Sequence, residues 1–257
     1  MKYGLLPARP ADLARAPRLG AHPIARRMAQ PVLDRSSVPF APQMFGNNDL
    51  SDCTAAGLGN AALALGALDG FQPVVDSGAV EAFYSATSGY VPGQPATDRG
   101  AVLTDVLAYQ ARTGFNSGAQ LLTGPWATVD PYDRNLLALG METCGVVVLG
   151  VALSEADMRR IGQVWDVGVM STGGDPTPGS AGLHCLLGFD YAGLKDGSLL
   201  RLATWGGLQP ATWQWVEQAI REAHVVVWRS VLATSGVNWS GVSYETLAAE
   251  TAAFGIP

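Results

Sequence analysis

The sequence predicts an α+β fold of one domain, with a helical first lobe and an antiparallel β second lobe. Apolar residues at helical spacing dominate the first half of the 257 residues, and short apolar runs bounded by turn residues dominate the second half. Hydrophobic residues make up 48% of the chain and charged residues only 15%, which is typical of a globular protein with a well-buried core. The length suits one large domain.

We expect residues 1–42 to form an extended arm ahead of a domain spanning 43–257. The arm is rich in proline and arginine and has no sustained period, so only a short helix at 23–30 is plausible within it. Residues 1–40 hold seven basic and two acidic side chains, a net charge of +5 on a chain whose total is −6. Such an arm could bind an acidic neighbouring protein, a nucleic acid, or the acidic body of its own chain. Nucleic acid fits least, because the arm is aromatic-free between Tyr3 and Phe40 and its basic residues are scattered.

Helices are predicted in the first half of the domain over 52–67, 76–90, 100–115 and 130–145. The first is built from alanine, leucine and glycine with almost no charge, so we expect it to be buried on most sides. Ser51 or Asp52 is positioned to cap its N-terminus. The third ends at Gly114, a residue type that favours the helix C-terminus.

Strands dominate the second half, over 145–153, 183–193, 198–206 and 224–232. The sequence LKDG between the second and third of these strands predicts a hairpin. Further helices are predicted over 154–162, 212–223 and 243–255. Residues 164–182 read as a loop rich in glycine, proline and serine, and its part 171–180 is either a lid over a cleft or an ordinary solvated loop.

Three cysteines lie far apart in the sequence and do not suggest a disulfide framework. The spacing of histidines and cysteines predicts no zinc site, and we expect neither metal nor cofactor. The longest clean apolar run, CGVVVLGVAL at 144–153, is too short to cross a bilayer, and prolines and arginines interrupt the N-terminus. We therefore expect a protein synthesised in the cytoplasm that does not bind membranes.

Cys53 is placed where the first turn of the 52–67 helix should begin. A nucleophilic thiol needs a lowered pKa, an imidazole base and donors for an oxyanion, and a helix N-terminus favours the thiolate. Asn47 could turn its amide towards the same point, and His184 could approach on a strand of the second lobe. Because side chains alternate along a strand, Cys185 faces the core if His184 faces the cleft.

The alternative for Cys53 is a buried structural thiol, a common fate of free cysteine. The negative charge of Asp52 beside the thiol would also oppose its ionisation. The alternative for His184 is a core histidine whose ring nitrogens are satisfied by hydrogen bonds.

The segments GNNDLSDCTAA and HCLLGFDYAG…LLRLATWGG resemble the papain-like cysteine peptidases. The first motif of that family is an amide residue, a loop and then the nucleophilic cysteine. Its later motifs are a histidine at the start of a strand that reads roughly HAVxxVGY, and a strand that ends in Asn-Ser-Trp-Gly. The resemblance covers residues 43–206. It is closest to papain-like proteins encoded by phages and prophages, through the segments TDRGAVLTDVLAYQARTG, VWDV, DPTPGSAGLH and TWGGLQPATWQW.

The resemblance implies a nucleophile at Cys53, a base at His184, an oxyanion donor at Asn47, and a tryptophan at Trp205 that shields the pair from water. The chain departs from the family at four places. Ala203 stands where the family has the asparagine that orients the histidine, and Thr204 or a backbone carbonyl would have to take its role. Asparagine replaces the oxyanion glutamine, threonine replaces the tryptophan after the nucleophile, and a helix is predicted after residue 206 where the family has a glycine-rich strand.

Two functions stay open on this basis. The first is a structural, virion-associated component with a degenerate or weak thiol-hydrolase site, whose arm binds other protein chains of the assembly. The alternative is an active cysteine peptidase or amidase, with Cys53 attacking a peptide or cell-wall amide and His184 moving the proton. A pseudoenzyme that binds peptides in the old cleft is a third, weaker reading.

Overall fold

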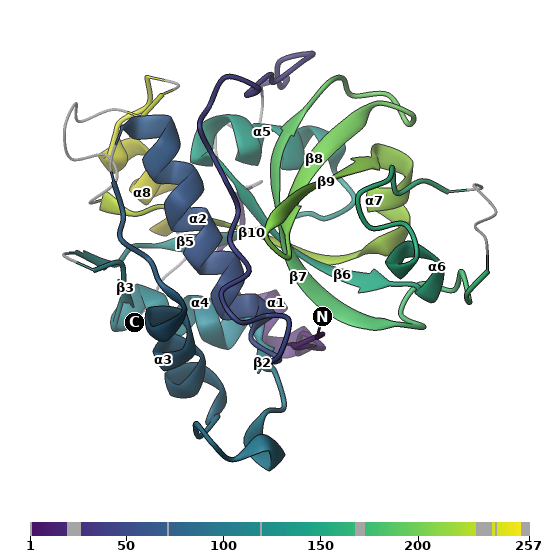
Figure 1. Cartoon of the computed structure of the whole chain (residues 1–257). Helices are drawn as coiled ribbons and strands as arrows, with labels where there is room; N and C mark the ends of the chain where they lie inside the picture. Colours follow the sequence, from purple (N-terminus) through teal and green to yellow (C-terminus); the bar gives the residue numbers. More distant parts are fainter. Residues whose placement is uncertain are drawn as a thin grey trace.

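The computed structural model describes residues 2–19, 27–70, 72–118, 120–167, 173–229, 238–239 and 241–252. It confirms the predicted α+β class: a helical part lies beside an antiparallel six-stranded sheet, with helix α2 between them (Figure 1). Within the described residues, no helix is both long enough and apolar enough to cross a bilayer.

All four helices predicted in the first half are present, three in the helical part and the fourth on the face of the sheet opposite to it. They are α2 (Cys53–Asp69), α3 (Ser77–Ser88), α4 (Leu103–Arg112) and α5 (Arg134–Cys144). Helix α2 is buried along most of its length, as its composition predicts. Its small residues allow this, since a Cβ at Gly57 would lie 3.1 Å from the sulfur of Cys185, and one at Gly59 would lie 3.0 Å from the ring of Phe45. The sheet and the chain that precedes α2 therefore pack directly on its backbone.

The sheet has the strand order β5-β10-β6-β7-β8-β9, and all neighbours are antiparallel. Its strands are β5 (Trp126–Val129), β6 (Val147–Leu153), β7 (Gly182–Tyr191), β8 (Leu199–Thr204), β9 (Gly207–Thr212) and β10 (Ile220–Val226). Alternate residues of β7 join two separate hydrophobic clusters. Cys185 and Leu187 pack with α2, whereas Leu186 packs with α5 and α7 (Trp213–Ala219).

The expectation that a helix replaces the strand of the family beyond residue 206 is wrong, because a strand precedes the helix. Strand β9 comes first and pairs with β8 across a tight turn, where Trp205 and Gly206 have φ values of 43° and 74°. The helix predicted over 212–223 ends at Ala219, because the following residues form β10 and hydrogen-bond to β5 and β6. Tertiary strand pairing thus overrides a locally helix-compatible sequence.

The remaining elements are short. They are β1 (Leu5–Leu6), α1 (Pro10–Arg15), β2 (Ala101–Val102), β3 (Phe115–Asn116), β4 (Leu121–Leu122), α6 (Glu155–Met158) and α8 (Tyr244–Ala252). Strand β2 takes the first residues of the helix predicted over 100–115, and Ser154 caps α6 with a capping box. The ends of the predicted 224–232 strand and 243–255 helix lie outside the described residues, as does part of the predicted 171–180 lid.

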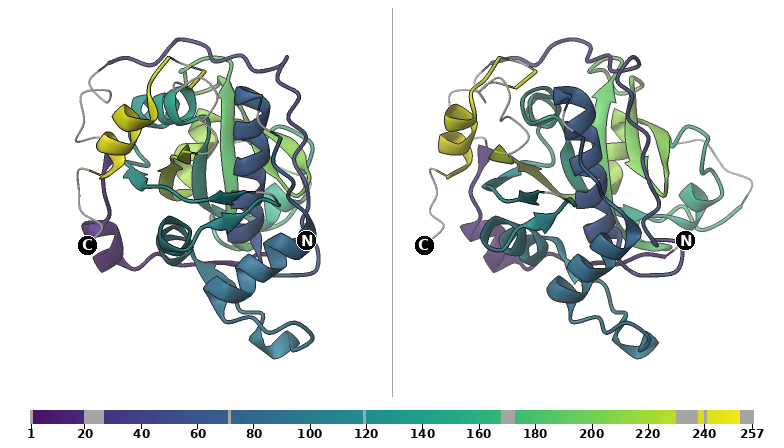
Figure 2. Two further views of the ribbon diagram at one scale, coloured as in Figure 1. Left: turned by 90° about the vertical axis from the view of Figure 1, so that its left-hand side faces the viewer. Right: turned by 60° about the vertical axis from the view of Figure 1, so that its left-hand side comes forward.

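The N-terminal arm lies along its own domain (Figure 2). Strand β1 pairs in parallel with β2, and the carbonyl of Pro17 accepts a 2.6 Å bond from the backbone N–H of Thr128 at the sheet edge. Further along, Leu33 and Tyr191 exchange two backbone hydrogen bonds of 2.9 and 3.2 Å. The predicted short helix at 23–30 falls partly outside the described residues; the helix that forms within the described arm is α1, which begins at Pro10.

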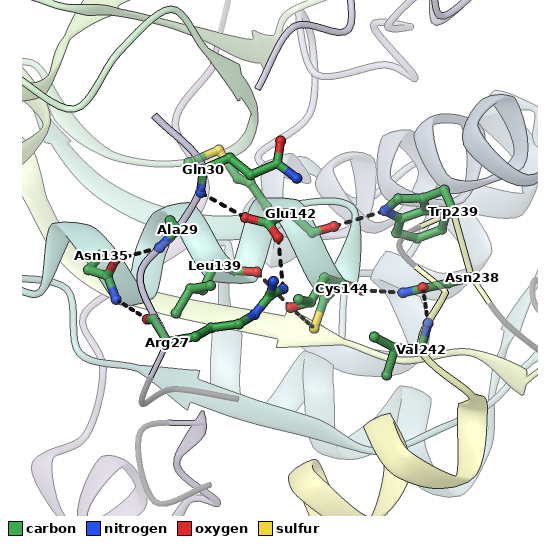
Figure 3. Close-up of polar contacts among 12 residues, drawn as sticks. Arg27, Ala29, Gln30, Asn135, Leu139, Glu142, Cys144, Asn238, Trp239 and Val242 are labelled. Atoms are coloured by element: carbon green, nitrogen blue, oxygen red, sulfur yellow. Dashed lines mark hydrogen bonds and ion pairs between the residues drawn. The ribbon is translucent and has the colours of Figure 1, made fainter. Parts of the chain in front are cut away.

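The basic side chains of the arm meet the acidic body of the same chain. Lys2 pairs with Asp98 at 2.8 Å, and Arg9 pairs with Asp105. The buried carboxylate of Glu142 at the end of α5 pairs with Arg27 at 2.8 Å (Figure 3). Of the three surfaces considered from the sequence, the described arm therefore uses the acidic body.

Around Glu142, α5 joins the arm to the C-terminal part of the chain (Figure 3). The side-chain carboxylate of Glu142 accepts a 3.1 Å hydrogen bond from the backbone N–H of Gln30. The backbone carbonyl of Glu142 accepts a 3.0 Å hydrogen bond from the indole N–H of Trp239. Asn135 lies seven residues before Glu142 on α5. Its side chain accepts a hydrogen bond from the backbone N–H of Ala29 and donates one to the backbone carbonyl of Arg27. These contacts fix the arm by its backbone and so depend little on its side-chain sequence.

Arg35 is the deepest anchor of the arm. Its guanidinium donates to the carbonyls of Phe189 and Met141, both at 2.7 Å, and to that of Gly145. Burial lowers the pKa of Arg35 to about 10, which still leaves it charged at neutral pH. The arm thus carries one buried charge whose donors are directed at three backbone acceptors.

We predict that Arg35→Ala lowers the free energy of unfolding by about 3 kcal/mol, because it leaves buried carbonyls without donors. Urea denaturation followed by tryptophan fluorescence measures this loss. Arg15→Ala is the matched control, since Arg15 is exposed at the end of α1 and its removal should change stability by no more than about 0.5 kcal/mol. Equal losses in the two variants would contradict the role of Arg35.

Candidate active site

Cys53 is the first residue of α2, where the helical part meets strand β7, and only 1% of its surface is exposed. Burial raises the pKa of the Cys53 thiol to about 12, although backbone N–H groups of Cys185, Gly4 and Thr54 favour the thiolate. The expectation of a depressed thiol pKa is therefore wrong for this conformation. The helix N-terminus is present, but the loss of solvent outweighs it.

His184 is the third residue of β7 and is also 1% exposed. Its Nε2 lies 2.7 Å from the hydroxyl oxygen of Thr204, and the Trp205 ring stacks on it with centroids 4.0 Å apart. Its Nδ1 is buried and, among the described residues, has no hydrogen-bond partner. Burial lowers the pKa of His184 to about 3, so the imidazole is neutral at physiological pH.

Thr204 occupies the place next to the histidine that the missing asparagine leaves open. Ala203 packs on the α2 side of the sheet, opposite Leu187, so it does not share the face of His184. The hydroxyl of Thr204 can act as donor or acceptor and so supports either tautomer of the ring. Trp205 covers this pair, as the resemblance implies.

Cys53 and His184 do not form a hydrogen bond, because Nε2 is bonded to Thr204 and Nδ1 has no partner among the described residues. Cys185 packs in the cluster around α2, whereas His184 lies against Trp205 on the other face of β7, as strand alternation predicts. Each residue is close to the cleft, but the structure does not join them into a nucleophile–base pair.

Asn47 is buried, and its amide donates a 3.1 Å bond to the carbonyl of Leu50 in its own loop. Its backbone carbonyl accepts a 3.0 Å bond from the N–H of Lys2 in the arm. The side chain that the resemblance assigns to an oxyanion is therefore used within the loop that leads to α2.

Asp52 occupies the N-cap position of α2 but does not cap it with its side chain. Its φ and ψ of −101° and 18° depart from the extended conformation in which a cap side chain reaches the first turn. Both carboxylate oxygens are buried without a hydrogen-bond partner among the described residues. Burial raises the pKa of Asp52 to about 7. The sequence-based role as a cap is wrong, and a buried, unpaired carboxyl takes its place.

The start of the arm covers these residues. A Cβ at Gly4 would lie 1.8 Å from the backbone oxygen of Ser51, so only glycine allows this approach. The Tyr3 ring lies edge-on to His184 and Trp205, with centroids 6.4 and 6.2 Å away. It also covers Gly182, where an added Cβ would meet the ring at 3.1 Å. The sequence analysis did not predict that Tyr3 and Gly4 cover the site. The one local feature that could have indicated it is an aromatic residue followed by glycine near the N-terminus.

Solved structures of cysteine proteases share this architecture. Xylellain, a cysteine protease from Xylella fastidiosa, superposes with a TM-score of 0.58 and 16% identity, over 87% of this chain and 95% of that one. The chain has the papain-like fold. A procathepsin B from Trypanosoma congolense gives a TM-score of 0.57 at 9% identity, covering 88% and 86% of the two chains. A digestive procathepsin L 3 from Tenebrio molitor larval midgut gives 0.56 at 13%, covering 84% and 77%. No protein-family profile matches the sequence, and no curated protein resembles it significantly.

The papain-like motif HAVxxVGY can be placed on strand β7 in two ways. The motif has its histidine six residues before its glycine, and Gly188-Phe189 in this chain corresponds to its Gly-Tyr pair. Counting back six residues from Gly188 reaches Gly182, the first residue of β7, whereas His184 is only four residues away. Counting forward from His184 instead, the eighth residue is Tyr191, which matches the tyrosine of the motif, and Asp190 then stands in place of its glycine. In the first placement, the ring of Tyr3 lies against the position where the motif has its histidine.

No cluster of three or more histidine, cysteine, aspartate or glutamate side chains that could hold a metal ion occurs in the described part of the chain.

We predict that Gly4→Ala increases the labelling of Cys53 by iodoacetamide at pH 8 at least about tenfold, because the added methyl forces the arm away from Ser51 and lets solvent reach the thiol. Mass spectrometry of timed samples measures it. Gly197→Ala is the matched control, because a Cβ there meets no atom within 4 Å. Unchanged labelling in the Gly4 variant would mean that the arm does not control access to Cys53.

Thr204→Val should lower the free energy of unfolding by about 1–3 kcal/mol, because it removes the partner of the buried His184 Nε2. Thr204→Ser keeps the hydroxyl and should retain most of the stability. Denaturant titration of the three proteins checks this order. A serine variant as unstable as the valine variant would show that the methyl group, rather than the hydrogen bond, matters here.

Proposed function

We propose that this papain-like protein is a non-catalytic, structural component of a larger protein assembly, such as a phage particle. The observation that carries this proposal is the arm in the cleft: Tyr3 and Gly4 lie on β7 and on the loop before α2 so closely that Cys53 and His184 are almost completely buried. A substrate cannot reach the thiol while this segment is in place.

The chemistry of the cleft supports the same conclusion. The thiol is protonated at neutral pH, the imidazole is neutral and not bonded to it, and the Asn47 amide is bound within its loop. Each of the three requirements of a thiol nucleophile is therefore unmet in this conformation. Retention of the fold with loss of its reaction chemistry is consistent with a scaffold role.

The proposed partners are other protein chains of the assembly. The arm uses several of its basic residues on its own body, yet Arg15 and Arg18 stay exposed, as do the apolar side chains of Met28 and Val32 at 77% and 47%. A neighbouring chain with an acidic, partly apolar surface would complement this stretch. The phage setting rests on the resemblance of the DCTAA, TDRGAVLTDVLAYQARTG and TWGGLQPATWQW segments to phage- and prophage-encoded proteins. Such a protein would be made in the cytoplasm and then incorporated into the virion.

A turnover assay tests the proposal. The full-length protein and Cys53→Ala are incubated with a pool of internally quenched peptides and with purified peptidoglycan, at pH 6 to 9. We expect identical signals from the two proteins, because the thiol does not take part in chemistry. Turnover that depends on Cys53 would overturn the structural role.

A cysteine peptidase or amidase is the second candidate, and the bond between His184 and Thr204 under Trp205 favours it. After withdrawal of the arm, Cys53 would attack the amide carbon while the Nδ1 of His184 accepts the thiol proton and then passes it to the leaving amine. Thr204 would hold the ring in place of the absent asparagine. Turnover by the Gly4→Ala variant that disappears in a Gly4→Ala, His184→Ala double variant would support this candidate.

A further inference from the structure

The buried carboxyl of Asp52 has no structural role in the cleft as it stands. It is 0% exposed, directly precedes Cys53, and neither of its oxygens has a hydrogen-bond partner among the described residues. The nearby Asn47 amide donates to the carbonyl of Leu50, and its influence on Asp52, which favours the anion, is outweighed by burial. An unpaired carboxyl is costly to bury when charged and much less so when protonated.

The charges that face Asp52 are unfavourable to its anion. Asp98 and Glu81 are the acidic neighbours that raise its pKa further after burial, and the adjacent Cys53 thiol is neutral. The ammonium of Lys2 is already bound to Asp98 at 2.8 Å. An ionised Asp52 would therefore need water, which it can reach only if its loop moves.

That loop holds the start of the arm. The carbonyl of Asn47 accepts from the N–H of Lys2, and the oxygen of Ser51 lies against Gly4. Asp98 joins the arm to this loop. One of its carboxylate oxygens pairs with the ammonium of Lys2, and the other accepts a 2.9 Å hydrogen bond from the backbone N–H of Ser51. Movement of residues 47–52 would thus release residues 2–4 from the cleft.

We propose that Asp52 is a pH-sensitive latch: its protonated carboxyl keeps residues 2–4 in the cleft, and its ionisation towards neutral pH releases them. The direction follows from linkage. A carboxyl that binds its proton more tightly in the closed state than in the open state favours closure at low pH, and the closed state loses stability as pH rises from the ordinary aspartate range through the closed-state pKa of about 7. The proposal concerns access to the cleft and is independent of whether the cleft catalyses a reaction.

The first test compares Cys53 labelling in the wild type and in Asp52→Asn from pH 5 to 8. The ratio of the two rates cancels the common effect of pH on thiol reactivity. We expect the wild-type to variant ratio to rise on the order of tenfold or more across this range, because asparagine cannot ionise. A ratio that stays constant with pH would overturn the proposal.

The second test needs no change at Asp52. The ring resonances of 13C-labelled Tyr3 report its contact with His184 and Trp205, and we expect them to titrate with a midpoint about pH 7. Asp49→Asn is the matched control, since this carboxylate of the same loop is exposed, and the titration should persist. Tyr3 resonances that do not change between pH 5 and 9 would contradict the latch even if the Asp52 variant failed to fold.

Discussion

The contact between the backbone of Gly4 and the carbonyl of Ser51 is the constraint on which the properties of the cleft depend. Because the arm approaches so closely, it excludes water from Cys53, His184 and Asp52 together. Removing solvent favours the neutral form of every titratable group, which raises the pKa of the thiol and the carboxyl and lowers that of the imidazole. Burial is thus the largest cause of all three shifts, and nearby carboxylates add to it for Asp52 and Cys53.

The arm can hold this position because its anchors are distributed along the body. Its first residues pair with β2 and Asp98, its middle bonds the edge strand β5, and its end is held by Glu142 and the buried Arg35. Most of these anchors use backbone groups or buried charges, whose loss costs more than that of an exposed ion pair. The net charges of +5 in residues 1–40 and of the acidic body are therefore features of one folded unit in the described structure.

The class of the fold and most of its elements could be predicted because they depend on local patterns. The apolar, uncharged composition of α2 predicts a buried helix, and the run VVLGVAL predicts β6. The errors occur where tertiary contacts decide, as at β9, which pairs with β8, and at the start of β10, which pairs with β6. For the site, the sequence predicted that Trp205 and Thr204 lie beside His184, but burial by an arm over 40 residues earlier in the chain leaves no periodic signal.

The two placements of the papain-like histidine motif have different physical consequences. If the motif position is Gly182, the chain has replaced an imidazole by an aromatic ring brought in by the arm, which fills the volume and cannot accept a proton near neutral pH; burial also raises the pKa of Tyr3. His184 then serves as a buried partner of Thr204, and its neutral state is suited to a stacked position under Trp205. If His184 is instead the base, its low pKa becomes a property of the closed cleft alone, and solvent entry on arm release would return it towards its ordinary value. Solvent access to the imidazole is therefore coupled to the position of Tyr3 and Gly4, because the segment that buries the ring also determines whether it can hold a proton.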